Sequence, residues 1–156
     1  MMKLIWLEEA EEKATISAEI LEYLPQWFGI PEATEWYVEA SRHLPMLVAY
    51  AADRPVGFLC LDESSSSTLE IIVMGILPDF HRQGIGRRLI EEAKIWVASQ
   101  DYVYLQVKTL AESHPDQYYS GTREFYHSMG FLDVEVFQNL WGPENPCLLM
   151  IMKVPY

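Results

Sequence analysis

The chain has 156 residues, 50% of them hydrophobic, and a formal net charge of −12 at pH 7. This length and composition favour one folded domain over residues 1–156 rather than a disordered chain. The acidic excess argues against a nucleic-acid-binding protein, which needs a basic surface to neutralise phosphates. No apolar run reaches the roughly 18 residues of a membrane span, and the N-terminus is unlike a signal peptide, so we expect no membrane partner and a cytoplasmic protein.

Hydrophobic periodicity along the chain predicts an alternation of strands and helices. Strands are expected at 3–7, 46–51, 56–61, 68–77, 102–108, 131–139 and 147–154, and helices at 10–24, 31–43, 84–100 and 118–129. Residues 52–55 indicate a hairpin, and the serine-rich residues 62–67 indicate a polar turn. The order β-α-α-β-β-β-α-β-α-β-β predicts an α+β fold with a mixed, mainly antiparallel sheet of six to seven strands. The strand–helix–strand unit from 68 to 108 should be its parallel part.

The two cysteines fall in strand-like segments. Cys60 and Cys147 are not spaced as metal ligands, so we expect buried thiols and no metal site.

A glycine-rich loop joins the strand at 68–77 to the helix that follows it. Gly84 and Gly86 remove side chains where the helix begins, so an anion can approach the unpaired backbone N–H groups of its first turn. Three arginines, at 82, 87 and 88, fall within one stretch of seven residues in this loop and the start of the helix. We therefore predict a diphosphate site on the backbone of Arg82, Gln83, Gly84, Ile85, Gly86 and Arg87.

Two familiar phosphate loops do not fit this segment. A P-loop requires Lys and Ser or Thr after its last glycine, and Gly86 is followed by Arg87 and Arg88. A dinucleotide-binding loop requires a third glycine, and Leu89 stands in that place.

The loop instead resembles the acetyl-CoA loop of the GNAT acyltransferases. Ile76-Leu77-Pro78 matches the family's Val-x-Pro, and Gly84 and Gly86 match its two small positions, whereas His81 replaces the usual Arg or Gln. In the family that position acts mainly through its backbone. Residues 125–131, Phe-Tyr-His-Ser-Met-Gly-Phe, resemble the second family signature, a helix that ends at Gly130.

The resemblance implies an α/β/α sandwich-like GNAT fold whose sheet splays at a cleft beside the loop. It also implies an acetyl-CoA-dependent N-acetyltransferase that works by direct attack in a ternary complex, with acetyl-CoA as co-substrate and no metal. The pantetheine arm would pair with the main chain of Met74, Gly75 and Ile76. Gly75 would mark a bulge or a close approach there.

Two residues are candidates for proton transfer. Glu70 lies before the loop on the same strand face as Ile72 and Met74, and is the candidate base; His114 and an ordered water are alternatives. Tyr126 aligns with the family's proton-donor tyrosine and is the candidate acid for the leaving thiolate.

Three other positions bear on the site. Tyr119 stands where the family usually has a pantetheine-binding Asn, and Gln106 stands where members that acetylate protein N-termini carry Glu. Arg88 or Arg123 is expected to meet the 3′-phosphate of the coenzyme.

The acceptor is expected to be a primary amine of a small molecule. An acidic surface would attract cations, or would serve only to keep the protein soluble. Aromatic residues near the expected cleft could enclose a cation, or could be ordinary packing; these are Trp27, Phe28, Trp36, Tyr37, Tyr118, Tyr119 and Trp141. A non-catalytic acyl-CoA sensor and a protein N-terminal or lysine acetyltransferase are the alternatives. The resemblance allows a homodimer, which the sequence does not decide.

Overall fold

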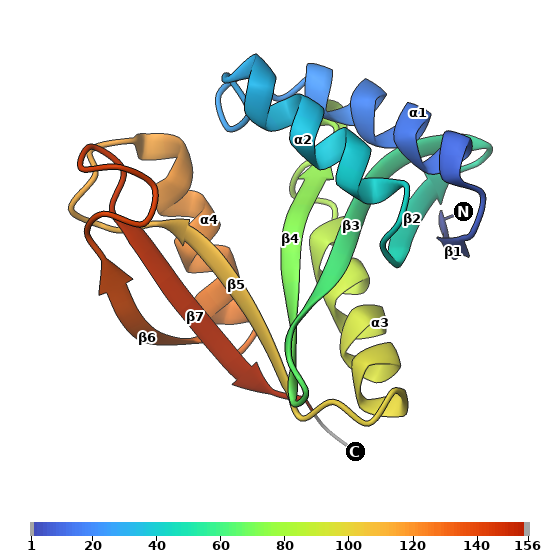
Figure 1. The fold of residues 1–156 in the computed structure, drawn as a ribbon. Coiled ribbons are helices and arrows are strands. Elements are labelled where there is room, and N and C mark those ends of the chain that lie inside the picture. Colours follow the sequence, from blue (N-terminus) through green and yellow to red (C-terminus); the bar gives the residue numbers. More distant parts are fainter. Residues whose placement is uncertain (1, 155–156) are drawn as a thin grey trace. The chain divides into compact units, whose positions relative to one another are not determined.

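A computed structural model describes residues 2–154 of the chain (Figure 1). These residues form two compact units. The first holds residues 2–62 and 72–93, and the second holds residues 63–71 and 94–154. No helix within residues 2–154 is long and apolar enough to cross a membrane.

Seven strands are joined by hydrogen bonds in the order β1-β2-β3-β4-β5-β7-β6. Their bounds are β1 Met2–Leu7, β2 Met46–Ala51, β3 Arg54–Ser65, β4 Thr68–Ile76, β5 Tyr104–Leu110, β6 Leu132–Phe137 and β7 Cys147–Lys153. The β4–β5 pair is parallel, whereas β1–β2, β2–β3, β5–β7 and β6–β7 are antiparallel. This confirms the predicted mixed, mainly antiparallel sheet and its parallel unit.

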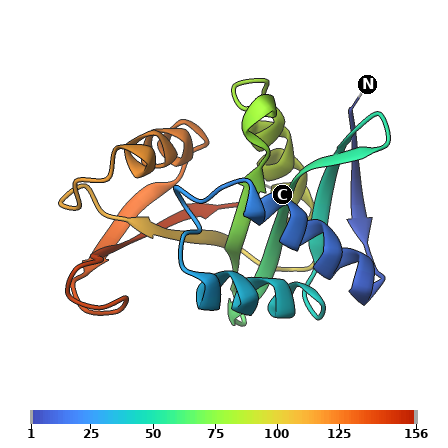
Figure 2. The same ribbon diagram turned by 90° about the horizontal axis from the view of Figure 1, so that it is seen from above.

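In the first unit, helices lie on both faces of the sheet (Figures 1 and 2). Helices α1 (Ala10–Glu22) and α2 (Pro31–Ser41) cover one face, and the start of α3 (Ile85–Ser99) covers the other. Gly75 of β4 allows α1 to pack closely, because an added Cβ would lie 3.0 Å from Leu24 Cδ1 and 3.3 Å from Ile20 Cγ2. Phe58 of β3 is fully buried beneath these helices.

In the second unit, helix α4 (Gln117–Ser128) packs on strand β5. Asp116 caps its start by accepting a 2.8 Å hydrogen bond from the Tyr118 N–H, and Gly130 ends it with a φ of 104°. Phe131 and Met150 are buried in the core of this unit.

Pairing between β4 and β5 is short. The register runs from Thr68 opposite Tyr104 to Ile71 opposite Val107, although β4 continues to Ile76 and β5 to Leu110. The last part of β4, which leads into the glycine-rich loop, belongs to the first unit, whereas the start of β4 belongs to the second.

The prediction of a polar turn at 62–67 is wrong for most of that range. Strand β3 continues through Ser65, and only Ser66 and Ser67 form the turn. Hydrogen bonding to the neighbouring strand outweighs the turn preference of serine, since these residues are exposed and their backbone groups gain partners in the ladder. The short 3₁₀ helix η1 (Pro78–Phe80) is not among the predicted elements. The predicted ends of the other helices and strands differ from the observed ends by only a few residues.

Candidate active site

The loop after β4 has an unusual backbone. Arg82 and Gly84 both adopt left-handed conformations, with φ angles of 61° and 80°. A non-glycine residue in this region is uncommon, and left-handed residues in such a turn aim successive N–H groups at one point, which makes an anion-binding concavity. The place of an added Cβ on Gly84 has no other heavy atom within 4 Å, so the loop is open on that side.

The N–H groups of this loop have no acceptor within residues 2–154. The His81 N–H donates to the Pro78 carbonyl at 3.2 Å, and the next backbone donor is the Arg88 N–H, which reaches the Gly84 carbonyl at 3.1 Å. The N–H groups from Arg82 to Arg87 therefore have no acceptor in the described part of the chain, and they lie at the positive end of a helix of 15 residues. We call residues 82–87 the cradle; its groups suit a phosphate.

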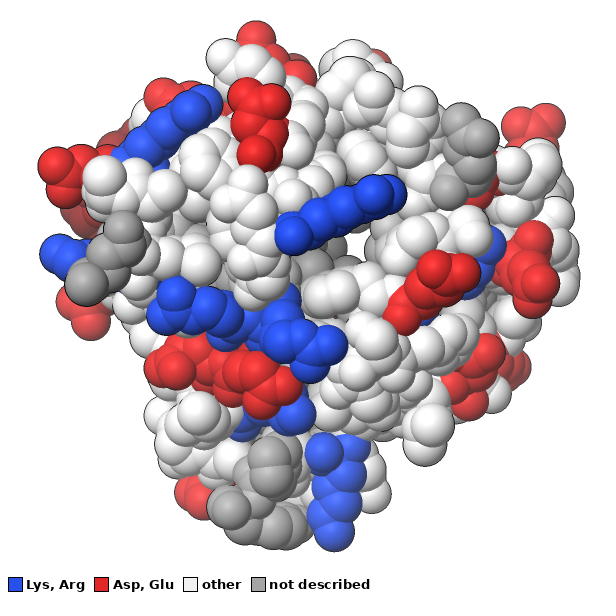
Figure 3. Space-filling model, turned by 180° about the vertical axis from the view of Figure 1, so that it is seen from behind, with Lys and Arg blue, Asp and Glu red and all other residues white. Residues whose placement is uncertain are grey.

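Three arginines surround the cradle. Arg82, Arg87 and Arg88 are exposed and form no ion pair with any residue that the structure describes. On the face drawn in Figure 3, Lys and Arg side chains lie among Asp and Glu, so basic groups are available despite the net negative charge. Arginine in such a setting can donate to phosphate oxygens.

The end of β4 is partly occupied by protein contacts. Gly75 provides the close approach that its sequence position indicated, but the neighbours are protein side chains: Ile20 of α1, Leu24 just after α1, and Phe58 of β3. The Ile76 carbonyl accepts a 2.7 Å hydrogen bond from His81 Nε2. Met74 and Ile76 are half-buried, and Gly75 is buried.

The side chain of His81 was missed by the sequence reasoning, which assigned this position a backbone role. Besides its bond to Ile76, its ring meets the Trp27 ring edge-on, with centroids 5.9 Å apart. Because a carbonyl only accepts, Nε2 must carry a proton. His81 thus ties the cradle loop to the end of β4 and to the α1–α2 loop. The aromatic character of residues 26–30 was the only signal in the sequence.

In the second unit, Glu70 is held by two donors from β5. Gln106 Nε2 donates to Glu70 Oε1 at 2.6 Å, and Lys108 Nζ donates to the same atom at 3.0 Å. The Glu70 side chain is only 14% exposed. Its Oε2 atom accepts no hydrogen bond within residues 2–154, so Oε2 is the atom that could receive a proton.

Tyr126 lies on the buried side of α4. It is 6% exposed, and its ring packs against Phe125 and Phe131 with centroids 5.5 Å away in each case. Burial raises the pKa of Tyr126 above its ordinary value of 10.0, and nearby Tyr119 adds to the shift. The hydroxyl has no hydrogen-bond partner in the part of the chain that is described. It is therefore a protonated phenol at neutral pH whose hydrogen remains available.

The alternative candidates are engaged elsewhere. His114 Nδ1 accepts a 3.1 Å hydrogen bond from the Asp116 N–H at the start of α4. Arg123 Nη1 donates to the Leu110 carbonyl at 2.7 Å. Both contacts position the loop before α4, whereas Arg88 keeps its guanidinium free of ion pairs within residues 2–154.

A loop of unpaired N–H groups after β4, in a mixed sheet of this strand order, suits an enzyme that binds a phosphorylated co-substrate. Residues 42–132, more than half of the chain, match the acetyltransferase (GNAT) domain family. The chain therefore belongs to the GNAT acetyltransferases, and the predicted family and enzyme class are confirmed. Acetyl-CoA is the co-substrate of this family.

Solved structures share the fold. A GNAT-family protein from Desulfovibrio desulfuricans matches over 99% of this chain and 100% of its own, with a TM-score of 0.85 and 17% identity. The ribosomal-protein-S18-alanine N-acetyltransferase from Escherichia coli matches over 100% and 96%, with a TM-score of 0.77 and 16% identity. An aminoglycoside 6′-N-acetyltransferase complexed with coenzyme A matches over 97% and 98%, with a TM-score of 0.73 and 18% identity. The comparison with curated protein sequences returned no match.

Proposed function

We propose that this chain transfers the acetyl group of acetyl-CoA to the primary amine of a small molecule, acting as one N-acetyltransferase domain over residues 1–156. The observation that supports acetyl-CoA as the co-substrate is the cradle, whose N–H groups from Arg82 to Arg87 have no acceptor among the described residues. These groups would hold the diphosphate, and Arg88 would meet the 3′-phosphate. The pantetheine arm would pair with those backbone N–H and C=O groups of Met74, Gly75 and Ile76 that are not used in hydrogen bonds within the protein.

The chemistry we propose needs no covalent enzyme intermediate. The neutral amine attacks the thioester carbon, the C–N bond forms, and the C–S bond breaks. Glu70 Oε2 takes the proton that the amine loses, directly or through an ordered water, and Tyr126 gives its hydroxyl proton to the departing thiolate. Exchange with solvent then restores both side chains.

Two observations support a small acceptor in the cytoplasm. Gln106, which cannot accept a proton, takes the place of the Glu of N-terminal acetylating members and donates to Glu70 instead. Cys60 and Cys147 are free thiols, as expected in a reducing compartment. The structural neighbours include enzymes named for a protein acceptor and for an aminoglycoside, so the acceptor class rests on the residues of this chain.

The test is an acetyl-transfer assay that detects the free thiol of CoA. Acetyl-CoA is mixed with the purified chain and with three acceptor panels: small primary amines, peptides with free N-termini, and lysine peptides with blocked N-termini. We expect the largest kcat/KM with a small amine. Faster turnover of either peptide panel would overturn the small-molecule assignment. Binding of CoA without any turnover would favour the sensor alternative.

A further inference from the structure

Glu70 lies in a row of side chains that crosses the sheet of the second unit. Parallel pairing sets Glu70 of β4 opposite Gln106 of β5, and antiparallel pairing sets Gln106 opposite Ile151 of β7. Residues that are paired in register project from the same face of a sheet. The amide of Gln106 therefore has a carboxylate on one side and an apolar side chain on the other.

The face of β5 that carries Gln106 is the more open one. Leu105, Val107 and Thr109 project from the opposite face and are at most 3% exposed. Gln106 and Lys108 alternate with them and are only half-buried. A molecule from outside the protein can therefore reach the side chains of Gln106 and Lys108.

The chemistry of its contacts fixes how the Gln106 amide is turned. Its Nε2 lies 2.6 Å from Glu70 Oε1 and 3.1 Å from the hydroxyl oxygen of Ser64. An ionised carboxylate only accepts, so the amide atom that faces Glu70 must be the NH₂ nitrogen and not the carbonyl oxygen. Both N–H groups of Nε2 are then used, and the carbonyl oxygen of the amide, Oε1, is turned away from Glu70 Oε1.

Two oxygens of this row accept no hydrogen bond from residues 2–154. One is Glu70 Oε2, because Gln106 and Lys108 both donate to Oε1. The other is Gln106 Oε1, whose neighbour Ile151 has no side-chain donor. Because one hydrogen bond joins the two polar side chains, these oxygens are near neighbours, and the row presents a pair of acceptors.

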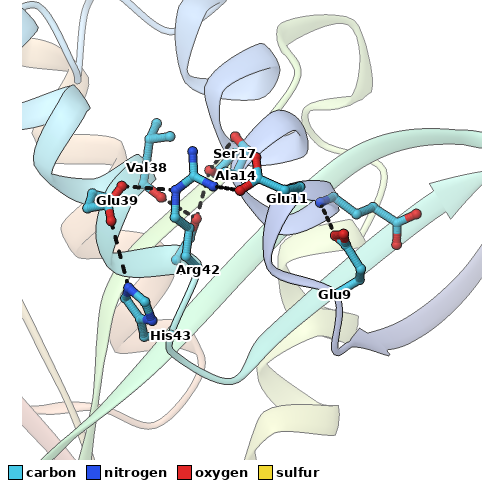
Figure 4. Close-up of polar contacts among 10 residues, drawn as sticks. Glu9, Glu11, Ala14, Ser17, Val38, Glu39, Arg42 and His43 are labelled. Carbon is cyan, nitrogen blue, oxygen red and sulfur yellow. Dashed lines mark hydrogen bonds and ion pairs between the residues drawn. The ribbon is translucent and has the colours of Figure 1, made fainter.

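A carboxylate oxygen without a donor is ordinary at the surface of this protein. In Figure 4, Arg42 pairs with Glu11 and donates to Glu39 at 2.9 Å, and the side chains of these glutamates are 74% and 66% exposed. Water reaches any oxygen that those pairs leave unused. The Glu70 side chain is 14% exposed, so its second oxygen is shielded from most water. An acceptor in that setting favours a ligand that donates a hydrogen bond.

Lys108 determines which charge suits this pair of acceptors. Its Nζ lies 3.0 Å from Glu70 Oε1, so the ammonium and the carboxylate neutralise each other. A cationic ligand would meet the charge of Lys108 as well as that of Glu70, and the two opposing interactions would largely cancel. The acceptors therefore suit the N–H groups of a neutral amine, which is the form that attacks a thioester.

We propose that Gln106 determines specificity for primary amines: Gln106 Oε1 and Glu70 Oε2 accept the two N–H groups of the neutral amine and leave its lone pair to attack. This inference rests on the proposed acetyl transfer. As the C–N bond forms and the C–S bond breaks, one amine proton passes to Glu70 Oε2, and Tyr126 protonates the thiolate. The other N–H stays on the nitrogen of the product amide and remains bonded to Gln106 Oε1. A secondary amine has a single N–H, so it would satisfy Glu70 and leave Gln106 Oε1 without a donor.

The test compares hexylamine with N-methylhexylamine in the acetyl-transfer assay. In the parent chain, kcat/KM should be on the order of 10²-fold larger for the primary amine, because the secondary amine leaves a polar group unpaired. Gln106→Met keeps the length of the side chain but has no carbonyl oxygen, so the preference should fall below about tenfold. This variant also loses one donor to Glu70, but that loss affects both amines and cancels in the ratio.

Lys108→Met is the matched control. It too removes one donor from Glu70 Oε1 and places a methionine at a half-buried position of β5, but it leaves Gln106 intact. The rates with both amines should change together, and the ratio should stay within about twofold of that of the parent chain.

A binding measurement separates this inference from acetyl transfer itself. Fluorine NMR titrations of the full chain with trifluoroethylamine and its N-methyl derivative need no acetyl-CoA, and both probes are largely neutral at pH 8 because the fluorines withdraw charge from nitrogen. Tighter binding of the primary probe, lost in Gln106→Met and kept in Lys108→Met, would support the inference even without turnover.

The outcomes that overturn the inference differ from those that overturn the function. Turnover with equal kcat/KM for the two amines, or with the same ratio in the parent chain and Gln106→Met, would remove Gln106 from amine recognition and leave acetyl transfer standing. A loss of the preference in Lys108→Met as large as in Gln106→Met would also overturn it. Neither turnover nor binding of either probe would overturn both proposals.

Discussion

The cradle and the side chains that we propose for proton transfer, Glu70 and Tyr126, differ in the kind of group they use. The cradle is made of main chain: it offers consecutive N–H donors, and Arg82 and Gly84 in it have left-handed backbone conformations. The groups in the second unit are side chains whose setting depends on residues far away in sequence, as with Glu70 and Lys108, which are 38 positions apart. The comparison teaches that affinity for the coenzyme and the rate of chemistry should respond to separate mutations.

The largest expected effect is at Tyr126. Tyr126→Phe should lower kcat on the order of 10³-fold, because general acid catalysis contributes about 10²–10⁴-fold, while the Kd for CoA stays unchanged. The fold should tolerate the change, since the hydroxyl has no partner in the described residues and the ring packing is kept. Single-turnover kinetics and calorimetry with CoA give the two numbers. An unchanged rate of the chemical step would remove Tyr126 from the reaction.

The cradle should show the reverse pattern. Gly84→Asp places a carboxylate near the diphosphate, and repulsion of about 3 kcal/mol should weaken CoA binding on the order of 10²-fold. Gly84→Asn is the matched control, because Asn also tolerates the left-handed φ of 80° and has the same shape without the charge. Calorimetry at two salt concentrations should show that the difference shrinks as salt rises. Equal CoA affinities of the Asp and Asn variants would place the diphosphate elsewhere.

Glu70 is tested by separating its role as a base from its ion pair. Glu70→Gln should lower kcat about 10²-fold, whereas Lys108→Met removes the ion pair but keeps the carboxylate and should cost far less. The pH dependence of kcat distinguishes the roles further, since loss of a base should remove the acidic limb of the profile. Similar losses in both variants, with unaltered pH profiles, would make Glu70 a structural partner of Lys108.

The sequence predicts local features of this molecule well. A proline, two glycines and the start of a helical hydrophobic pattern, all within a dozen residues, predict the loop that holds the cradle. Pro25, Pro31 and Gly130 predict where helices end or begin. These features depend on backbone conformation, which neighbouring residues determine.

The rest depends on contacts that no local pattern encodes. His81 bonds to Ile76 and meets Trp27 only because two loops come together, and Gln106 and Lys108 reach Glu70 only because β4 and β5 pair in a particular register. The extension of β3 through Ser65 likewise needs a neighbouring strand. Serine, histidine and lysine are common at protein surfaces, so the presence of these residues in the sequence does not predict the contacts that they make.

The two cysteines extend the comparison to stability. Burial raises the pKa of Cys60, in the first unit, from 9.0 to about 12, against a smaller opposing effect of Lys13. Burial also raises the pKa of Cys147, in the second unit, from 9.0 to about 11. Above pH 9 the unfolded thiols ionise while the folded ones stay protonated, so the unfolded state binds fewer protons. The free energy of unfolding should therefore fall as pH rises through these windows.

Urea denaturation at pH 7, 9, 10 and 11 measures this fall. For Cys60 the slope should approach at most about 1.4 kcal/mol per pH unit, so Cys60→Ala should flatten the alkaline decline, with a modest cost at pH 7 from the lost packing. Cys147→Ala should flatten it less, because its window is narrower. Tyrosine ionisation contributes to all three proteins and cancels in the differences. Parallel declines for the parent chain and Cys60→Ala would show that this thiol does not govern the alkaline loss of stability.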